Sequence, residues 1–500
     1  MDRLRKLYHS LSKAEIRYLK SYLEAFHSKG ENKALRLIEL LDCNKDISQD
    51  EASRILYGNP KSKAMLMLRS RLMERILDVL TLSINLQGNP IYKEDPPLLE
   101  TVQIFKMYSQ ARLLRRRGLG FLAEELLEKI AKQSETQGIP EGKILALLQL
   151  RNISTSPQDV GWKLKLGIEE AIDQYKQDIL AAGFFDEFRV IHSGRTSSDP
   201  EKVQFLQDAT SQLEKELEST YSVRAHYYYL DMMVSLHSLR METDKCRIVL
   251  QEQIDLVASQ PGLKTSTRQG IPMMRLARLE LMHGNFEAAY IASEHACQTF
   301  NPKRNNYLSA SAYFLFSSIF TNRIKDVFES LKSLPPLMAR KKQFPSTSII
   351  QYLFSCGWFI KSDFKQAGIA LDEAENLLSD KGGWNVGIRV YEIMILIEKD
   401  LLDIASNRIE TLRKHIGRYK VTERENLIYR YLYLLDKAAF DFSEPSKEMQ
   451  DILSKLRDGV MWEPVSHEVI RFDSWVVSKI THSTFYEQLL SDIQKEKVGV

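Results

Sequence analysis

The sequence predicts an all-α protein, a right-handed superhelix of paired helices preceded by a small N-terminal helical domain. Three observations support this fold class. The 22 Gly and 15 Pro residues are only 37 of 500, and these residue types serve turns and strand ends. Apolar residues follow helical spacing along the whole chain, with no convincing run of alternating β-branched residues. A loop-plus-helix pattern also recurs at a nearly constant period in the second half of the chain.

The N-terminal stretch, residues 1–88, is predicted to form the small helical domain. Ser12-Lys13-Ala14-Glu15 and Ser48-Gln49-Asp50-Glu51 are capping-box patterns, in which the Ser oxygen and the Glu carboxylate satisfy free backbone N–H groups at a helix start. The first pattern predicts a helix from Lys13 to His27. We expect further helices at about 33–42, 48–57 and 61–85. Prolines between residues 87 and 97 then stop the helical pattern and favour a linker.

Helical patterns resume near Leu98, and we predict a repeat array over residues 98–460. Breaks in this pattern fall near 153–159, 193–200, 260–272 and 442–446. The last stretch, residues 461–500, contains an amphipathic helix pair or a bent helix from Phe472 to Lys497. Because the end of a helical array needs a polar covering layer, we expect this stretch to cap it.

A loop followed by a helix recurs in the second half of the array. Its anchor is a small or β-branched residue, and the spacings between anchors are 38, 40 and 38 residues, at Ala289, Val327, Ala367 and Ala405. A small side chain there lets the second helix of a pair cross the first one closely. A near-constant period of this length is typical of a solenoid, in which each helix pair covers the apolar face of its neighbour.

The best copy of this pattern resembles the tetratricopeptide repeat family. The family motif is matched at Gly284, Phe286, Ala289, Ser293 and Ala296, and next best at Phe364, Ala367, Leu371 and Ala374. The period is longer than the usual one of about 34 residues, and the first helix of each repeat departs from the family pattern. The two ends of the chain are similar to those of uncharacterised bacterial helical-repeat proteins. The resemblance implies tetratricopeptide-like helical repeats across roughly 270–420, with weaker members at 100–270.

Charge and cysteine content limit the class of protein. The net charge is only +3, and residues 1–90 contribute +5, so the chain lacks the strong positive field of a dedicated nucleic-acid binder. The four cysteines lie far apart, which excludes a CxxC pair and indicates buried thiols in a reducing cytoplasm. No secretory signal or membrane-spanning run is visible. We therefore expect a cytoplasmic protein.

The sequence contains no motif for catalysis, metal binding or a cofactor. There is no HExxH motif, no histidine–cysteine cluster with metal-ligand spacing and no GxSxG elbow. The paired carboxylates lie on polar helix faces. A general acid or base needs a pocket that shifts its carboxyl pKa, and a solvated helix face does not provide one. We therefore expect a protein that is not an enzyme and binds no cofactor.

A superhelical groove is the expected place for function. The repeat register puts six mostly apolar or aromatic residues on the groove side of the first helices, namely Met274, Arg278, Phe316, Tyr352, Phe359 and Met394. They either pack between successive helices or line a groove for an apolar or extended peptide, where a few aromatic and Arg anchors dominate binding. This interpretation predicts a non-catalytic protein–protein interaction scaffold. The sequence does not name the partner or the oligomeric state.

The alternative is a bacterial regulator with an N-terminal DNA-binding module and a peptide-sensing repeat domain. The helices at 33–42, 48–57 and 61–85 follow one another around a tight turn, and the third carries a basic cluster of Lys61, Lys63, Arg69, Arg71 and Arg75. That helix is long, its apolar face is wide and no wing follows it, which favours packing on the array or docking of a partner. A second basic cluster is Arg112, Arg115, Arg116 and Arg117. It precedes Gly118, where the helix dipole itself attracts cations.

Overall fold

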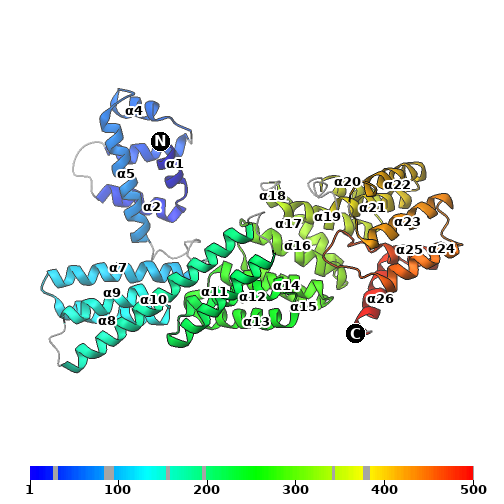
Figure 1. Cartoon of the computed structure of the whole chain (residues 1–500). Coiled ribbons are helices and arrows are strands. Elements are labelled where there is room, and N and C mark those ends of the chain that lie inside the picture. The colour runs from blue at the N-terminus through cyan, green and yellow to red at the C-terminus, as the bar shows by residue number, and fades with distance from the viewer. Residues whose placement is uncertain are drawn as a thin grey trace. The chain divides into compact units, whose positions relative to one another are not determined.

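The structure, a computed structural model, is helical in all its regular elements over the residues that it describes (Figure 1). These residues are 1–25, 32–44, 46–83, 95–153, 158–193, 199–339, 344–374, 383–419 and 421–498. The all-α prediction is confirmed for this part of the chain. Most of the expected linker at 87–97 lies outside the described residues. So does a further short basic run of the sequence, Arg340-Lys341-Lys342.

The chain divides into two compact units, which are described separately. The first comprises residues 1–180, 216–224 and 260–265, and the second comprises 181–215, 225–259 and 266–500. The boundary falls within a single long helix, α10 (Gln158–Ser193).

The first unit begins with five helices that share a core of their own. They are α1 (Asp2–His9), α2 (Lys13–Ala25), α3 (Lys33–Cys43), α4 (Gln49–Tyr57) and α5 (Lys63–Leu82). Leucines and isoleucines such as Leu19, Leu37 and Ile76 are fully buried among them. Both predicted helix starts are confirmed. The backbone N–H of Ser12 donates to the Glu15 carboxylate over 2.7 Å, and Ser48 Oγ accepts from the next turn over 3.1 Å.

The first unit continues with the start of the array. Its helices are α7 (Pro96–Arg116), α8 (Gly120–Thr136), α9 (Pro140–Ile153), the first part of α10 and the short η2 (Pro261–Leu263). Gly142 lets α9 pack closely on its neighbours, because a Cβ at this position would lie 2.9 Å from the side chain of Ile104 and 2.5 Å from Ser134 Oγ.

The second unit is a succession of helices in which neighbours along the chain pack together. It begins with α11 (Asp199–Ser219), whose end crosses into the first unit, and α12 (Val223–Leu239). The helices that follow are α13 (Thr243–Ser259), α14 (Ser266–Met282), α15 (Phe286–Thr299), α16 (Asn305–Phe320), α17 (Ile324–Ser333), α18 (Pro335–Met338), α19 (Pro345–Ile360), α20 (Phe364–Asp372), α21 (Gly383–Glu398), α22 (Leu402–Ile416), α23 (Glu423–Lys437), α24 (Lys447–Ser454), the π-helical turn η4 (Lys455–Gly459), α25 (Phe472–Thr481) and α26 (Phe485–Val498).

A left-handed residue forms the corner of each helix pair in the repeat region. The corners have φ between 56° and 72°, at Met241, Gly284, Asn322, Ser362 and Asp400. After each corner the next N–H donates to a carbonyl five residues back, for example Asn285 to Glu280 over 2.9 Å. The last four corners are 38, 40 and 38 residues apart. Each anchor lies five residues after its corner and is fully buried, so the predicted period is present in the backbone.

Candidate functional site

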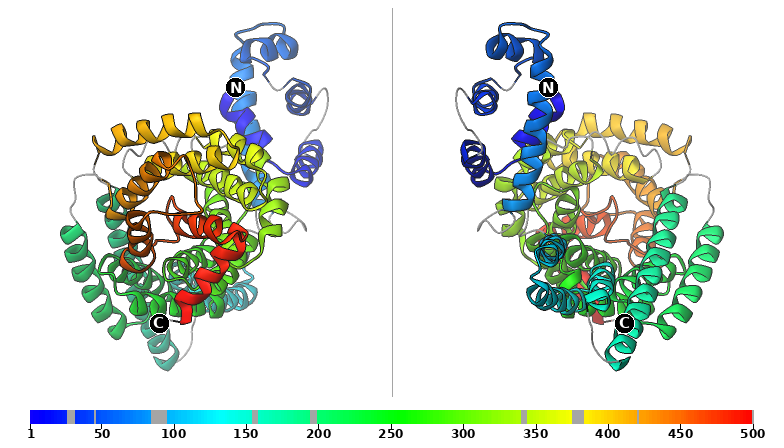
Figure 2. Two further views of the ribbon diagram at one scale, coloured as in Figure 1. Left: turned by 90° about the vertical axis from the view of Figure 1, so that its right-hand side faces the viewer. Right: turned by 90° about the vertical axis from the view of Figure 1, so that its left-hand side faces the viewer.

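The first helices of the later pairs, α16, α19, α21 and α23, face the chain's own C-terminal segment, defined here as residues 460–498. Figure 2 shows this segment, in red, inside the curve of the later helices. The ring of Phe485 lies 5.5 Å from that of Phe359 in α19. The hydroxyl of Tyr486 donates to the carbonyl oxygen of Ile319 in α16 over 2.8 Å. The segment therefore packs along the first helices, whereas the sequence predicted a cap at the end of the array.

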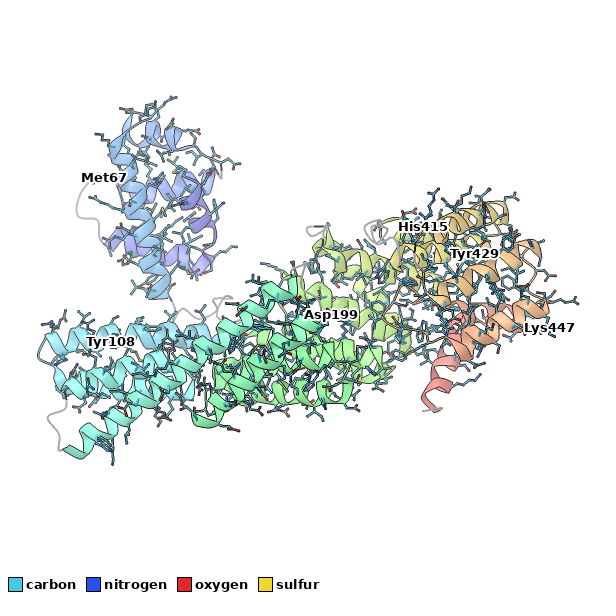
Figure 3. All side chains as sticks on the ribbon, viewed as in Figure 1. Met67, Tyr108, Asp199, His415, Tyr429 and Lys447 are labelled. Atoms are coloured by element: carbon cyan, nitrogen blue, oxygen red, sulfur yellow. The ribbon has the colours of Figure 1, made fainter. Side chains whose placement is uncertain are left out.

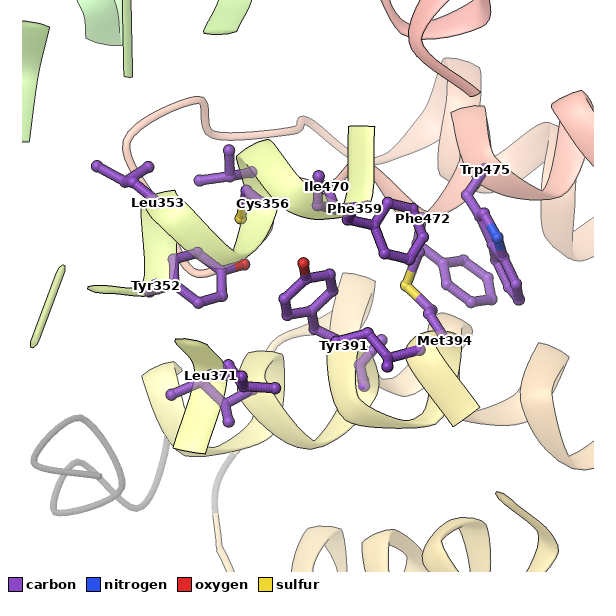
Figure 4. Packing of buried hydrophobic residues seen from close by; sticks show 14 of the residues in the cluster. Tyr352, Leu353, Cys356, Phe359, Leu371, Tyr391, Met394, Ile470, Phe472 and Trp475 are labelled. Carbon is purple, nitrogen blue, oxygen red and sulfur yellow. The ribbon is translucent and has the colours of Figure 1, made fainter. Parts of the chain in front are cut away.

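Four of the six predicted groove residues are buried. Phe316, Tyr352, Phe359 and Met394 are at most 3% exposed. Figure 4 shows Phe359 and Met394 near Phe472, and Tyr352 beside Tyr391. The Tyr352 hydroxyl donates to the backbone carbonyl of His467. The C-terminal segment contacts Tyr352 through the carbonyl of His467 and Phe359 through the ring of Phe485, so these two side chains do not line an open groove. Their burial supports the alternative, a packing role.

Gly387 in α21 makes room for the C-terminal segment. A Cβ at this position would lie 2.1 Å from the imidazole ring of His467, a distance at which atoms overlap. His467 in turn places its Nε2 3.3 Å from the buried carboxylate of Glu425 in α23. The close approach of backbone and ring explains why glycine occupies a helix interior, where it is otherwise unfavourable.

A buried ion cluster attaches the segment to α23. Arg424 Nε lies 2.6 Å from Glu468, and its Nη2 lies 2.6 Å from Asp473. Arg471 Nε lies 3.0 Å from both Asp473 oxygens. Burial opposes the charged form of Arg424, but the two carboxylates raise its pKa overall. Since each buried charge has a partner, loss of one member would leave another uncompensated.

A second polar contact holds α25 against α21. The carboxylate of Glu398 accepts from Trp475 Nε1 over 2.6 Å and from Lys479 Nζ over 2.7 Å. Trp475 is otherwise fully buried, so its single N–H needs this acceptor. Local sequence patterns did not indicate this contact, because Trp475 and Lys479 lie 77 and 81 residues after Glu398 in the chain.

The buried thiols are poorly suited to nucleophilic chemistry. Burial raises the pKa of the Cys297 thiol to about 12, and it also raises that of Cys356, which lies between Tyr352 and Tyr391. A thiol with a raised pKa is protonated near neutral pH, and the thiolate is the reactive form.

The other two predicted groove residues lie on α14, where Met274 is half-buried and Arg278 is exposed. Next to them, Arg275 lines a hollow of about 670 Å³ together with residues of α10 and α12. This volume falls in the range of ligand pockets. The hollow is lined by the aromatic Phe185 and Phe188, and by polar or charged residues including Arg189 and His192.

A buried carboxylate forms the polar wall of this hollow. Asp231 is 3% exposed, and Arg275 Nη1 lies 2.6 Å from it. Gln253 also donates to Asp231, over 3.3 Å. The guanidinium of Arg275 thus satisfies a buried charge while about a third of its side chain stays accessible. It is a positioned polar group of the kind that orients a bound segment.

The basic residues of α5 do not form one face. Lys63 and Arg71 are exposed, as is Lys61 just before the helix, whereas Arg69 donates to Gln49 and Arg75 donates to the Tyr22 hydroxyl over 3.1 Å. The exposed side of α5 also carries acidic and apolar residues, namely Glu74, Asp78, Leu66, Met67 and Leu77, of which Met67 is labelled in Figure 3. A recognition helix needs a cationic face against the phosphates. This mixed face supplies only isolated cations.

Comparison with known proteins finds no family model that matches the chain and no matching curated protein. The resemblance to tetratricopeptide repeats therefore depends on the residues and the period described above. Among the described helices, none combines the length and the apolar character needed to cross a membrane.

Proposed function

We propose that this protein is a non-catalytic, cytoplasmic interaction scaffold, a right-handed tetratricopeptide-like solenoid that binds a partner protein or peptide in the hollow between α10, α12 and α14. This proposal rests on one observation, namely that the first helices of the later pairs and those of the earlier pairs differ in how far other parts of the chain cover them. Those of the later pairs are covered by the C-terminal segment, whereas Arg275 of α14 lines a hollow with exposed rim residues, although the predicted Met274 and Arg278 do not line it.

The chemistry of the hollow supports an extended segment as its ligand. Aromatic and Arg side chains contribute most binding energy at protein interfaces, and here Phe185, Arg189 and Arg275 line one cavity. The carboxylate of Asp231 offsets the charge of Arg275. The hollow is therefore not strongly charged, and it suits a segment that combines apolar and polar side chains.

Affinity purification of the full chain from its native host tests this proposal. We expect a co-purifying protein that is lost when the exposed rim of the hollow is changed by Arg189→Glu with Val190→Ser. Both side chains are exposed, so the fold should be kept. A matched control is Lys361→Glu with Ile291→Ser, which alters equally exposed positions away from the hollow. Equal recovery of the same protein with both variants would contradict the proposal.

A further inference from the structure

The first helix of the array, α7, has an outer face on which several apolar and basic side chains are exposed. Its inner face packs on α8, α9 and η2 through Ile104, Met107 and Ala111, which are buried. On the opposite side Leu98 is 44% exposed, Phe105 is 38% exposed and Leu113 is 62% exposed. An array end normally needs a polar outer layer to remain soluble. The apolar residues on this end point to a covering partner.

The outer face of α7 has the spacing of a helix-packing seam. Leu98, Val102, Phe105, Ser109, Arg112 and Arg116 follow one another at steps of four and three residues. This alternation keeps side chains in one line along a helix and is the spacing by which two helices pack together. The line is apolar over its first half and basic over its second half. Leu113 flanks the basic half.

The basic half carries charges that have no partner among the described residues. In the part of the chain that the structure describes, Arg112, Arg116 and Arg117 have no ion-pair or hydrogen-bond partner for their guanidinium groups. The neighbouring Arg115 is different, because it donates to the Gln149 side chain over 3.3 Å and to the Asn152 carbonyl over 3.2 Å. Two exposed guanidinium groups in the seam, and that of Arg117 directly after it, favour a partner with carboxylates at the matching end.

We propose that the outer face of α7 docks an amphipathic helix of a partner protein, apolar where it meets Leu98, Val102 and Phe105 and acidic where it meets Arg112 and Arg116. A partner helix is favoured because the apolar and the basic residues of the seam lie at opposite ends of α7. A helix that lies in a membrane surface keeps its apolar face along its whole length, and a nucleic acid would need cations along the whole seam. This face shares no residue with the hollow, so either docking site can fail without the other.

Two designed peptides of about 21 residues, the length of α7, test the proposal against the full-length protein. Both carry Leu at seam positions of one half. The other half carries Glu in the first peptide and Lys in the second. Binding is measured by fluorescence anisotropy of the labelled peptides. At ~50 mM salt we expect the Glu peptide to bind and the Lys peptide not to bind, and at ~300 mM salt we expect the Glu peptide to weaken.

Variants of the full chain locate the peptide. The double variant Arg112→Ala with Arg116→Ala should weaken the Glu peptide about tenfold and flatten its salt dependence, since two charge contacts are lost. Phe105→Ser should weaken it about as much through the apolar half. Ile248→Ser removes an apolar side chain of α13 that is even more exposed than Phe105 and should leave binding unchanged.

Four outcomes would overturn the proposal. Equal binding of the Glu and Lys peptides would remove the charge argument, and unchanged binding in Phe105→Ser would place the peptide elsewhere. A wild-type dimer in analytical ultracentrifugation that becomes a monomer in Phe105→Ser would identify a second copy as the occupant. Sedimentation with anionic vesicles that depends on Arg112 and Phe105, without peptide binding, would identify a membrane surface.

Discussion

At the scale of single residues, Gly387 shows how tightly the C-terminal segment fits. Gly387→Ala places a Cβ against His467 and should lower the free energy of unfolding by about 1–3 kcal/mol, since an overfilled contact forces its neighbours to shift. His467→Gly removes the clashing ring and Cβ, so in that background the same change should cost much less. Chemical denaturation of the four proteins measures this coupling.

Gly368→Ala is the matched control for this experiment. Gly368 also lies in a helix of the repeat region, but a Cβ there meets nothing within 4 Å. Alanine should therefore stabilise the protein by about 0.5–1 kcal/mol through helix propensity alone. Equal effects at Gly387 and Gly368 would show that the contact with His467 is loose.

The corner residues lead to a second prediction at this scale. Met241 is left-handed with φ of 57° and is 79% exposed, so glycine there would relieve backbone strain without loss of packing. After the larger entropy of the unfolded chain is subtracted, Met241→Gly should stabilise by about 0.5 kcal/mol. Gly284→Ala, at φ of 72° with open space around it, should destabilise by about 0.5 kcal/mol by the same balance of strain and unfolded-chain entropy. Thermal unfolding of the two variants should therefore shift in opposite directions.

At the scale of helices, the repeat was predictable and its corners were only partly so. The anchors Ala289, Val327, Ala367 and Ala405 are buried at the predicted spacing because a helix crossing admits only certain side chains. A left-handed corner usually signals itself by glycine. Among the later corners only Gly284 is a glycine, whereas Ser362 and Asp400 adopt the same left-handed conformation with other residue types.

Helix α5 gives a prediction for the regulator hypothesis. Its exposed cations Lys63 and Arg71 are followed on the same helix by the exposed carboxylates of Glu74 and Asp78, so the attraction to phosphates is weak and easily screened. In gel-shift assays with the full chain, duplex DNA should bind only at low salt and be released at ~150 mM. Specific retention at that salt, abolished by Arg69→Ala with Arg71→Ala, would instead support the alternative of a DNA-binding regulator.

At the scale of the second unit, the sequence indicated the groove positions but not what covers them. Phe316, Tyr352, Phe359 and Met394 follow the repeat register, which is a local property of the chain. Their cover comes from residues far away in sequence, as the hydrogen bond from Tyr352 to His467 shows across 115 positions. Local periodicity carries no information about such pairs. The C-terminal helices therefore resembled a cap at the end of the array.

Because the segment and the first helices share one core, we expect them to unfold together. Trp475 is fully buried and donates to Glu398, so Trp475→Ala should cost about 3–5 kcal/mol. Hydrogen exchange in this variant should speed up in α19 and α21 as well as in α25, because loss of the cover opens the helices beneath it. The control is Trp162→Ala, at a position 56% exposed on α10. It should change neither the free energy of unfolding nor the hydrogen exchange of these helices. Faster exchange confined to α25 and α26 would show instead that the segment is a separable occupant, and that the groove beneath it can open to a partner.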